Sequence, residues 1–318
     1  MELISLGIDI GGTNTIAGFV DRNGKVLDKV SIRTCDYELI GDYMHALTAE
    51  INNSFAPLKD RYSLCGIGIG APNGNYFTGT VDFAPNLRWK GVLPLAEMFH
   101  HRFNVPAVLT NDANAAAIGE MMYGGARGMK DFVVVTLGTG VGSGFVVNGE
   151  LVYGHDGFAG ELGHTIVDTE GRLCGCGRKG CLETYTSASG LKRTMIDLLN
   201  KSETPSNLRH FDLDSISAKM IAFEAKMGDI LAIEAFEITG KILGLQLANT
   251  IALTSPEAIF LYGGLSKSGD VLFAPTHKYM ELYLLNIFQN KVKLLYSELE
   301  SDHAAILGAS ALVWKELN

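Results

Sequence analysis

The chain has 318 residues, of which 47% are hydrophobic and 19% are charged, and it carries a formal net charge of −9. This composition predicts a well-packed globular protein with one large domain or two smaller ones. The negative charge argues against a nucleic-acid-binding face, which would be basic, and no apolar run reaches the roughly 18 residues of a membrane-spanning helix.

The N-terminal stretch MELISLGIDIGGT begins directly with the pattern of a strand. It has neither a basic segment nor a small-residue cleavage site, so we expect no signal peptide and a cytoplasmic protein. The chain contains five cysteines. In a reducing compartment these thiols are expected to stay free, and an odd number leaves one cysteine without a disulfide partner.

Two stretches in different halves of the chain share one order of parts. In the first, an apolar strand at 4–10 runs into a Gly-Gly-Thr turn, and two further strands follow around Asn23-Gly24. In the second, an apolar strand at 132–138 runs into a Gly-rich turn, and two short strands follow around Asn148-Gly149. Asn-Gly between apolar runs is typical of a tight hairpin. We interpret the two stretches as an internal duplication whose glycine turns face one cleft.

Strand and helix patterns alternate along the rest of the chain, which predicts an α/β fold with helices on the faces of the sheets. Apolar runs predict strands at 64–72, 106–111 and 258–264. Helical spacing predicts helices at 39–55, 92–104, 112–125, 188–201, 217–226, 229–252 and 304–316.

Glycine turns directly after apolar strands are candidate phosphate sites. Such a turn exposes several backbone N–H groups in one concavity, to which the hydroxyls of Thr13 and Thr139 add donors. A third turn of this kind is Gly263-Gly264. The structural alternative for each is a simple tight turn. The chain lacks the Walker sequence, and GTGVGSG misses the Rossmann spacing and leads into a strand, so neither a P-loop nor a dinucleotide site is expected.

Two aspartates occupy positions that suit phosphoryl-transfer chemistry. Asp9 lies in an apolar strand just before the first glycine turn, where a carboxylate needs hydrogen bonds or a nearby cation such as Mg²⁺. Asp112 follows a strand and begins a helix. Either Asp112 or Asn111 caps that helix, and Asp112 is also a candidate general base, kept ionised by the helix N-terminus, for a substrate hydroxyl.

A cysteine-rich stretch follows in the second half, with the spacing His164-x9-Cys174-x-Cys176-x4-Cys181. One histidine and three cysteines suit a closed, structural zinc site. The alternatives are a disulfide, which leaves one cysteine unpaired, a redox dithiol, which is more often C-x-x-C, and a catalytic zinc, which needs an open position. A metal here would also fix Glu161, His164 and Glu183 near one another, an arrangement suited to sugar hydroxyls.

The motifs DIGGTN, PNLRW, NDANAAAIGE, LGTGVGSG, GELGH, CGCGRKGCLE and YGGLS, in this order from residue 6 to about 310, resemble those of the ROK family of bacterial sugar kinases. The resemblance implies an actin- and hexokinase-like fold, with two domains of ribonuclease-H-like topology and ATP in the cleft between them. We expect a small α/β domain from residues 1–111 plus 302–318. The large α/β domain then spans 112–301 and contains the zinc-binding insert at 164–181.

The resemblance also implies a role for each matching residue. Asp112 would be the catalytic base, and Asp9 would assist Mg²⁺. Sugar contacts would come from Asn86, Asn111, Asp112, Glu161, His164 and Glu183, with the 70–74 turn nearby. ATP would be held by Gly11, Gly12, Thr13, Asn14, Thr139, Gly140, Gly263 and Gly264. Zinc would be bound by His164, Cys174, Cys176 and Cys181. One residue departs from the family pattern, since Asn14 stands where the motif usually ends in lysine and cannot supply its positive charge.

We therefore expect an ATP-dependent hexose kinase that acts on glucose, because Glu161 and Glu183 are both present, and that forms a homodimer by analogy with the family. N-acetylmannosamine, N-acetylglucosamine, allose and fructose are the alternative substrates. A sugar-responsive repressor is disfavoured because only eight residues precede Asp9 and the chain is acidic. A sugar-binding protein without catalysis is the third hypothesis, which Asn14 supports and Asp112 opposes.

Overall fold

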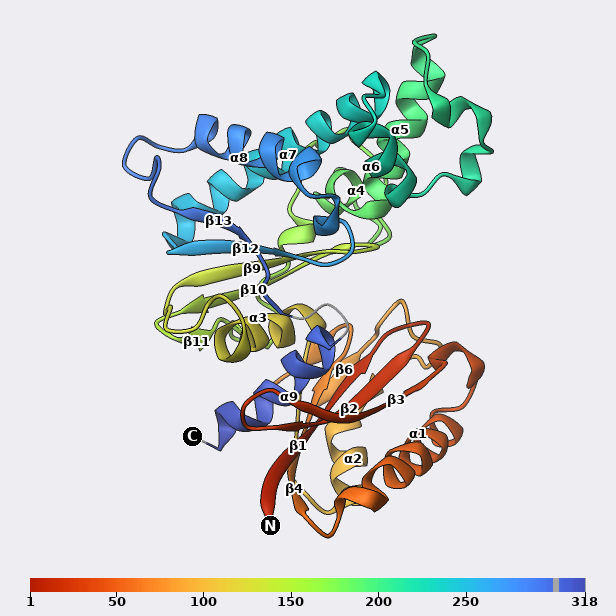
Figure 1. Ribbon diagram of the computed structural model, residues 1–318, viewed down its shortest axis with the longest axis vertical. Helices are drawn as coiled ribbons and strands as arrows, with labels where there is room; N and C mark the ends of the chain where they lie inside the picture. The colour runs from red at the N-terminus through yellow and green to blue at the C-terminus, as the bar shows by residue number, and fades with distance from the viewer. Residues whose placement is uncertain (300–302, 318) are drawn as a thin grey trace.

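The computed structural model describes residues 1–299 and 303–317, and its two main sheets lie one above the other in Figure 1. The lower sheet has the order β3-β2-β1-β4-β8 and the upper sheet the order β11-β10-β9-β12-β13. The lower strands are β1 (Glu2–Ile10), β2 (Thr15–Asp21), β3 (Val26–Ile32), β4 (Tyr62–Gly70) and β8 (Ala107–Thr110). The upper strands are β9 (Phe132–Leu137), β10 (Val141–Val147), β11 (Glu150–Leu151), β12 (Ala258–Tyr262) and β13 (Lys293–Tyr296).

The two sheets repeat one topology, which confirms the predicted duplication. In each sheet the first strand pairs antiparallel with the second and parallel with the fourth, and the fourth pairs parallel with the fifth. The registers also correspond at the glycine turns, where Ile10 pairs with Thr15 and Leu137 pairs with Val141. Asp9 and Thr136 therefore hold equivalent positions, one residue before the end of the leading strand.

Alternation along β1 decides what covers each face of the lower sheet. Ile4, Leu6, Ile8 and Ile10 belong to the core that contains α1 (Ile40–Phe55) and α2 (Leu95–Phe103). The opposite face is small and polar, and the Ser5 hydroxyl lies 2.7 Å from the Ser310 hydroxyl of α9 (Ala304–Glu316). Asp9 belongs to this second face.

Two helices lie between the sheets (Figure 1). Helix α9 packs on β1 and β4 of the lower sheet, while α3 (Asp112–Tyr123) packs on β9 and β10 of the upper sheet. The two helices also pack on each other. The far face of the upper sheet is covered by helices, which are α4 (Glu183–Thr186), α5 (Ala188–Lys201), α6 (Ala218–Lys226), α7 (Ile230–Thr254) and α8 (Asp270–Tyr283).

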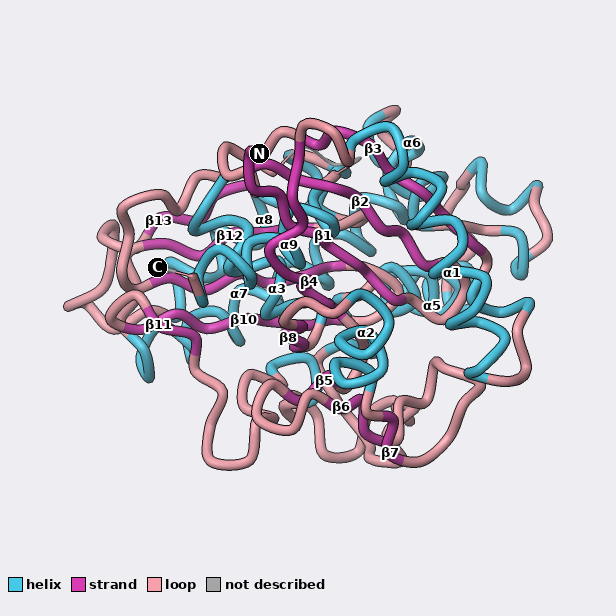
Figure 2. Tube along the Cα trace, turned by 90° about the horizontal axis from the view of Figure 1, so that it is seen from below, coloured by secondary structure: helices cyan, strands magenta, loops and turns pink. Residues whose placement is uncertain are grey.

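The predicted elements differ from the structure in several places. Residues 92 and 93, predicted as the start of a helix, form strand β7 (Val92–Leu93) instead. This strand completes a small sheet with β5 (Gly74–Asn75) and β6 (Thr80–Asp82), which lies beside α2 and β8 (Figure 2). Helix α8 and strand β13 were not predicted. Pro275 interrupts the helical pattern of α8, although the helix continues through it.

The division into domains at 1–111, 112–301 and 302–318 stays a prediction, and its second boundary lies in residues 300–302, outside the described part of the chain. Within the described residues, no helix is long and apolar enough to cross a membrane.

Candidate active site

A cleft of about 420 Å³ opens at the ends of the leading strands of both sheets. It collects predicted site residues that are far apart in the sequence. Those lining it are Asp9, Asn86, Asn111, Asp112, Thr139, Gly140, Glu161, His164, Glu183 and Gly263. The acidic and imidazole groups of this set come from four separate segments of the chain. Asp9 lies in β1, Asp112 and Glu183 each begin a helix, and Glu161 and His164 lie in one loop. The fold therefore brings these groups together.

Asp112 is the first residue of α3, which follows β8 directly, and it lines the cleft. The structure assigns the N-cap to Asn111, whose Oδ1 accepts a hydrogen bond of 2.6 Å from the Asn114 N–H. Asp112 is the first helical residue, and its Oδ1 accepts a hydrogen bond of 2.9 Å from the Ala113 N–H. Because Asn111 caps the helix, the carboxylate of Asp112 keeps a free oxygen for a substrate.

The carboxylate of Asp112 is open to solvent in the cleft, yet the surrounding protein walls reduce its hydration. This burial raises the pKa of Asp112, and its backbone hydrogen bonds oppose the rise. Asp9 lies nearby, since the position of a Cβ on Gly70 is 3.6 Å from Asp9 Oδ1 and 3.7 Å from Asp112 Cα. Burial, and secondarily the charge of Asp112, raises the pKa of Asp9 to about 7.

Glycine turns bring backbone close to these side chains. A Cβ on Gly140 would lie 2.7 Å from Glu183 Oε2, so the Thr139-Gly140 turn passes directly beside that carboxylate. Gly12 faces the backbone carbonyl of Asn86, with which a Cβ would collide. Gly263 has φ +104°, and a Cβ there would lie 2.7 Å from the Leu137 carbonyl oxygen. Only glycine fits such a conformation and approach without strain.

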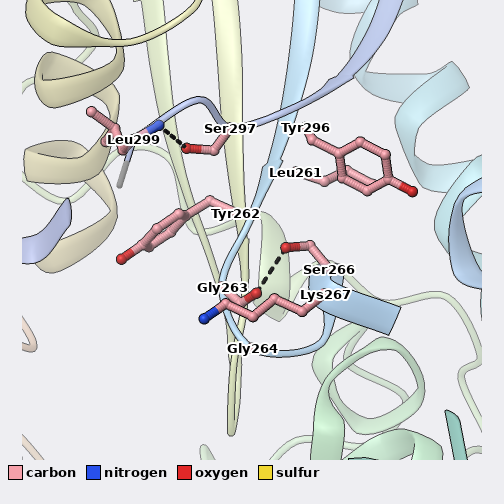
Figure 3. Close-up of a pocket in the computed structure, with 9 residues that line it drawn as sticks. All are labelled: Leu261, Tyr262, Gly263, Gly264, Ser266, Lys267, Tyr296, Ser297 and Leu299. Atoms are coloured by element: carbon pink, nitrogen blue, oxygen red, sulfur yellow. Dashed lines mark hydrogen bonds between the residues drawn. The ribbon is translucent and has the colours of Figure 1, made fainter. Parts of the chain in front are cut away.

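The remaining predicted nucleotide residues lie outside the lining of this cleft. Gly11, Gly12, Thr13 and Asn14 form a closed turn in which the Gly11 N–H donates to the Asn14 carbonyl at 2.9 Å. Gly264 lines a second pocket of about 270 Å³, which shares Tyr262 and Gly263 with the cleft (Figure 3). The role of all five residues in ATP binding stays a prediction.

The predicted zinc ligands come together in one cluster. One ligand atom from each of His164, Cys174, Cys176 and Cys181 lies within 4.8 Å of all the others. The Sγ atoms of Cys176 and Cys181 are 3.6 Å apart, whereas a disulfide bond measures about 2.05 Å, so the two thiols are free. A set of three sulfurs and one ring nitrogen at this spacing fits the size and chemistry of tetrahedral Zn²⁺.

The cysteine cluster is joined to the cleft by two residues. His164, which ends a 3₁₀ turn (Leu162–His164), belongs to the cluster and lines the cleft. Glu183 begins α4, two residues after Cys181, and its Oε1 lies 2.9 Å from Cys174 Sγ and 3.8 Å from His164 Nδ1. Burial raises the pKa of Glu161, and the neighbouring His164 opposes the rise. His164 and Glu183 therefore connect the cluster to one wall of the cleft, and the fixing of that wall by a bound zinc stays a prediction.

The charge of the cleft is strongly unbalanced. Asp9, Asp112, Glu161 and Glu183 line it, and the described lining residues include no lysine or arginine. Carboxylates gathered in this way favour a bound cation. The donor set therefore fits a divalent metal such as Mg²⁺, which prefers oxygen ligands.

Comparison with known proteins shows the family to which the chain belongs. The sequence model of the ROK family matches residues 5–316. The chain belongs to the ROK family. A glucokinase of Halalkalibacterium halodurans is 32% identical, with 98% of this chain and 96% of that protein covered. The xylose repressor of Bacillus subtilis is 28% identical, and the match covers 97% of this chain but 76% of the repressor.

Solved structures of ROK proteins have the same fold. A ROK family glucokinase from Streptomyces griseus, in complex with glucose and AMPPNP, superposes with a TM-score of 0.82 at 32% identity, covering 98% of this chain and 99% of that one. The two-domain actin- and hexokinase-like fold expected from the motifs is thereby confirmed.

Sequence reasoning missed several residues of this ROK cleft. Thr136, Ser143 and Tyr262 also line it. Thr136 is the next-to-last residue of β9 and Tyr262 is the last residue of β12, and both strands lead into a glycine turn. Both therefore share with Asp9 a position next to a glycine turn, a signal that the sequence already contains. Ser143 had no such signal, because its place in the cleft depends on the pairing of β10 with β9.

Proposed function

We propose that the protein is an ATP-dependent hexokinase that converts glucose to glucose 6-phosphate. One observation carries the proposal: a solvent-open carboxylate, Asp112, lies in one cleft with Glu161, His164, Glu183 and two glycine turns. This combination offers a base, hydroxyl-binding groups and phosphate-binding backbone within a single site. Glucokinase similarity over nearly the whole chain, and the glucose and AMPPNP named for the S. griseus structure, support glucose and ATP as the substrates.

In the proposed reaction, the 6-hydroxyl oxygen of glucose forms a bond to the γ-phosphorus as the bond to the β-phosphate oxygen breaks and ADP leaves. Asp112 takes the hydroxyl proton as the new bond forms. Glu161, His164 and Glu183 hold other hydroxyls of the sugar, and Asn86 and Asn111 add amide contacts. Positioning accounts for much of the acceleration in such a reaction. When bound with ATP, Mg²⁺ supplies positive charge to the transferring phosphate, and Asp9 would hold it, through water.

The cluster of His164, Cys174, Cys176 and Cys181 is proposed to hold a structural Zn²⁺. With four protein ligands, such an ion leaves no open coordination position for substrate. Its effect on the reaction is then indirect, through the placement of His164 and Glu183. The division at residues 1–111, 112–301 and 302–318 is proposed to let the two lobes close on the substrates, which would exclude water from the reacting groups.

A homodimer is expected from the family resemblance alone, and sedimentation velocity tests it. The proposed use of ATP favours a cytoplasmic site of action.

The direct test of the function is ADP release from Mg·ATP in the presence of glucose, N-acetylmannosamine, N-acetylglucosamine, allose and fructose. We expect the highest kcat/KM with glucose. A preference for an N-acetylhexosamine would support the proposed kinase activity but would show that glucose is not the substrate. Absence of turnover with every sugar, while glucose still raises the melting temperature, would instead support a sugar-binding protein without catalysis.

A further inference from the structure

The nucleotide end of the site contains one positively charged side chain that the proposed reaction has not used. Lys267 lines the pocket that shares Tyr262 and Gly263 with the cleft. Among the described residues lining either space, it is the single lysine or arginine. Asn14, at the position where the family motif supplies a lysine, lines neither space and carries no charge.

The backbone around Lys267 is firmly anchored to the glycine turn. Lys267 is the middle residue of a 3₁₀ turn (Ser266–Ser268) between β12 and α8. The Ser266 hydroxyl donates to the Gly263 carbonyl at 2.7 Å, and the Leu265 N–H donates to the Leu137 carbonyl at 2.9 Å. The second bond ties this turn to the end of β9, which leads into the Thr139-Gly140 turn. The start of the Lys267 side chain is therefore fixed relative to both glycine turns.

The amino group of Lys267 has no partner among the described residues of the chain. Lys278 and Lys315, by contrast, form ion pairs with Glu237 and Glu150. In Figure 3 the Lys267 side chain extends along Gly263 and Gly264, and its amino group ends on the side of the turn toward Tyr262. An exposed ammonium without an ion pair remains available for a ligand at this turn.

A polyphosphate in this acidic site needs positive charge. The triphosphate of ATP would enter a space lined by Asp9 and Asp112, and backbone N–H groups supply only partial charges to it. An ammonium next to the turn would offset the repulsion as a point charge, the usual manner in which lysine binds phosphate.

We propose that Lys267 binds the phosphates of the nucleotide held at the Gly263-Gly264 turn and supplies the positive charge that residue 14 lacks. The inference rests on the proposed function, because it takes ATP as the donor. It assigns nucleotide recognition to a residue outside the three glycine motifs. It also predicts that the lysine distinguishes nucleotides by their phosphates and is indifferent to the base.

The test is titration calorimetry, without sugar, of Mg·ATP, Mg·ADP and adenosine into wild type, Lys267→Met, Lys267→Arg and Lys291→Met. Lys291 is an exposed lysine of the same half of the chain that lines neither space, so its variant is the matched control. We expect Lys267→Met to weaken ATP binding about tenfold, a loss that corresponds to about 1.4 kcal/mol. Adenosine affinity should not change, Lys267→Arg should restore most of the ATP affinity, and Lys291→Met should match wild type.

Equal ATP affinity in wild type and Lys267→Met would overturn the inference. An equal loss for ATP and adenosine would also overturn it, because the contact would then be to the nucleoside. Glucose-dependent ADP release by the wild type tests the kinase separately. If the wild type binds ATP in a manner that depends on Lys267 but phosphorylates no sugar, the proposed kinase function is wrong and the proposed contact of Lys267 with phosphate is supported.

Discussion

Gly119 of α3 and Gly308 of α9 face each other where the two helices cross between the sheets. A Cβ on Gly119 would lie 2.8 Å from the Cα of Gly308, and a Cβ on Gly308 would lie 2.7 Å from the carbonyl oxygen of Ala115. The helices therefore meet backbone to backbone. Since α3 begins with Asp112 and α9 packs on β1, which contains Asp9, this crossing sets the spacing of the two carboxylates.

Gly119→Ala should destabilise the protein even though alanine is the better helix former. The nearest atoms to the new methyl group are backbone atoms of Gly308, which cannot rotate away. Overpacking of this kind costs about 1–3 kcal/mol and exceeds the gain of up to about 1 kcal/mol in helix propensity. The melting temperature should fall accordingly.

The control for this variant is Gly41→Ala in α1, where no described atom beyond the neighbouring residues and the helix's own backbone lies within 4 Å of the added Cβ. This change should leave the melting temperature unchanged or raise it slightly. If Gly119→Ala behaves like Gly41→Ala, the close crossing of α3 and α9 is wrong.

Local patterns in the sequence were sufficient to predict much of the fold. The alternation in ISLGIDI places large apolar residues on one face of β1 and small or polar residues on the other, and the structure buries the two faces against different helices. The cysteine cluster was also predictable, because its four candidate ligands lie within 18 residues and glycines between them permit a tight fold. In both cases the deciding information is close together in the chain.

Features that depend on distant segments could not be predicted in this way. Helix α8 was missed because Pro275 removes a hydrogen-bond donor, whereas the structure packs that proline against Gly240 of α7. The short strands β5, β6 and β7 carry too few residues for a periodic pattern. Lys267 has no local signal either, since its relevance comes from the lack of any other lysine or arginine among the described residues that line the cleft and the neighbouring pocket.

Asp112→Asn should lower kcat for glucose phosphorylation by at least about two decades, the usual contribution of a general base. Asparagine preserves the size of the side chain and its acceptor oxygen for the Ala113 N–H, so glucose binding should persist. Stopped assays for ADP and calorimetry with glucose measure the two quantities on the same preparation. Near-normal turnover would remove Asp112 from the role of base.

The activity should fall on the acidic side of neutrality, at a higher pH than an ordinary aspartate would give. Asp112 must be ionised to accept a proton, so activity is present above its pKa and lost below it. Burial raises the pKa of Asp112, which moves the loss upward from the usual value near 4. Asp9 and Glu161 line the same cleft, so the observed midpoint belongs to the three carboxyl groups together. The measurement is kcat/KM for glucose between pH 4.5 and 8.5; a flat profile would contradict it.

Freshly reduced protein should contain about one zinc per chain, held by His164, Cys174, Cys176 and Cys181. Removal of the ion by a chelator should lower the melting temperature, because binding to a folded site contributes to folding free energy. Cys176→Ser should lose the metal and reduce kcat/KM for glucose, since His164 and Glu183 lose their support. Cys35→Ser, a change at a half-buried cysteine outside the cluster, should keep the zinc and the activity. Zinc-free protein with the same melting temperature as the holo form would show that the four residues hold no structural metal.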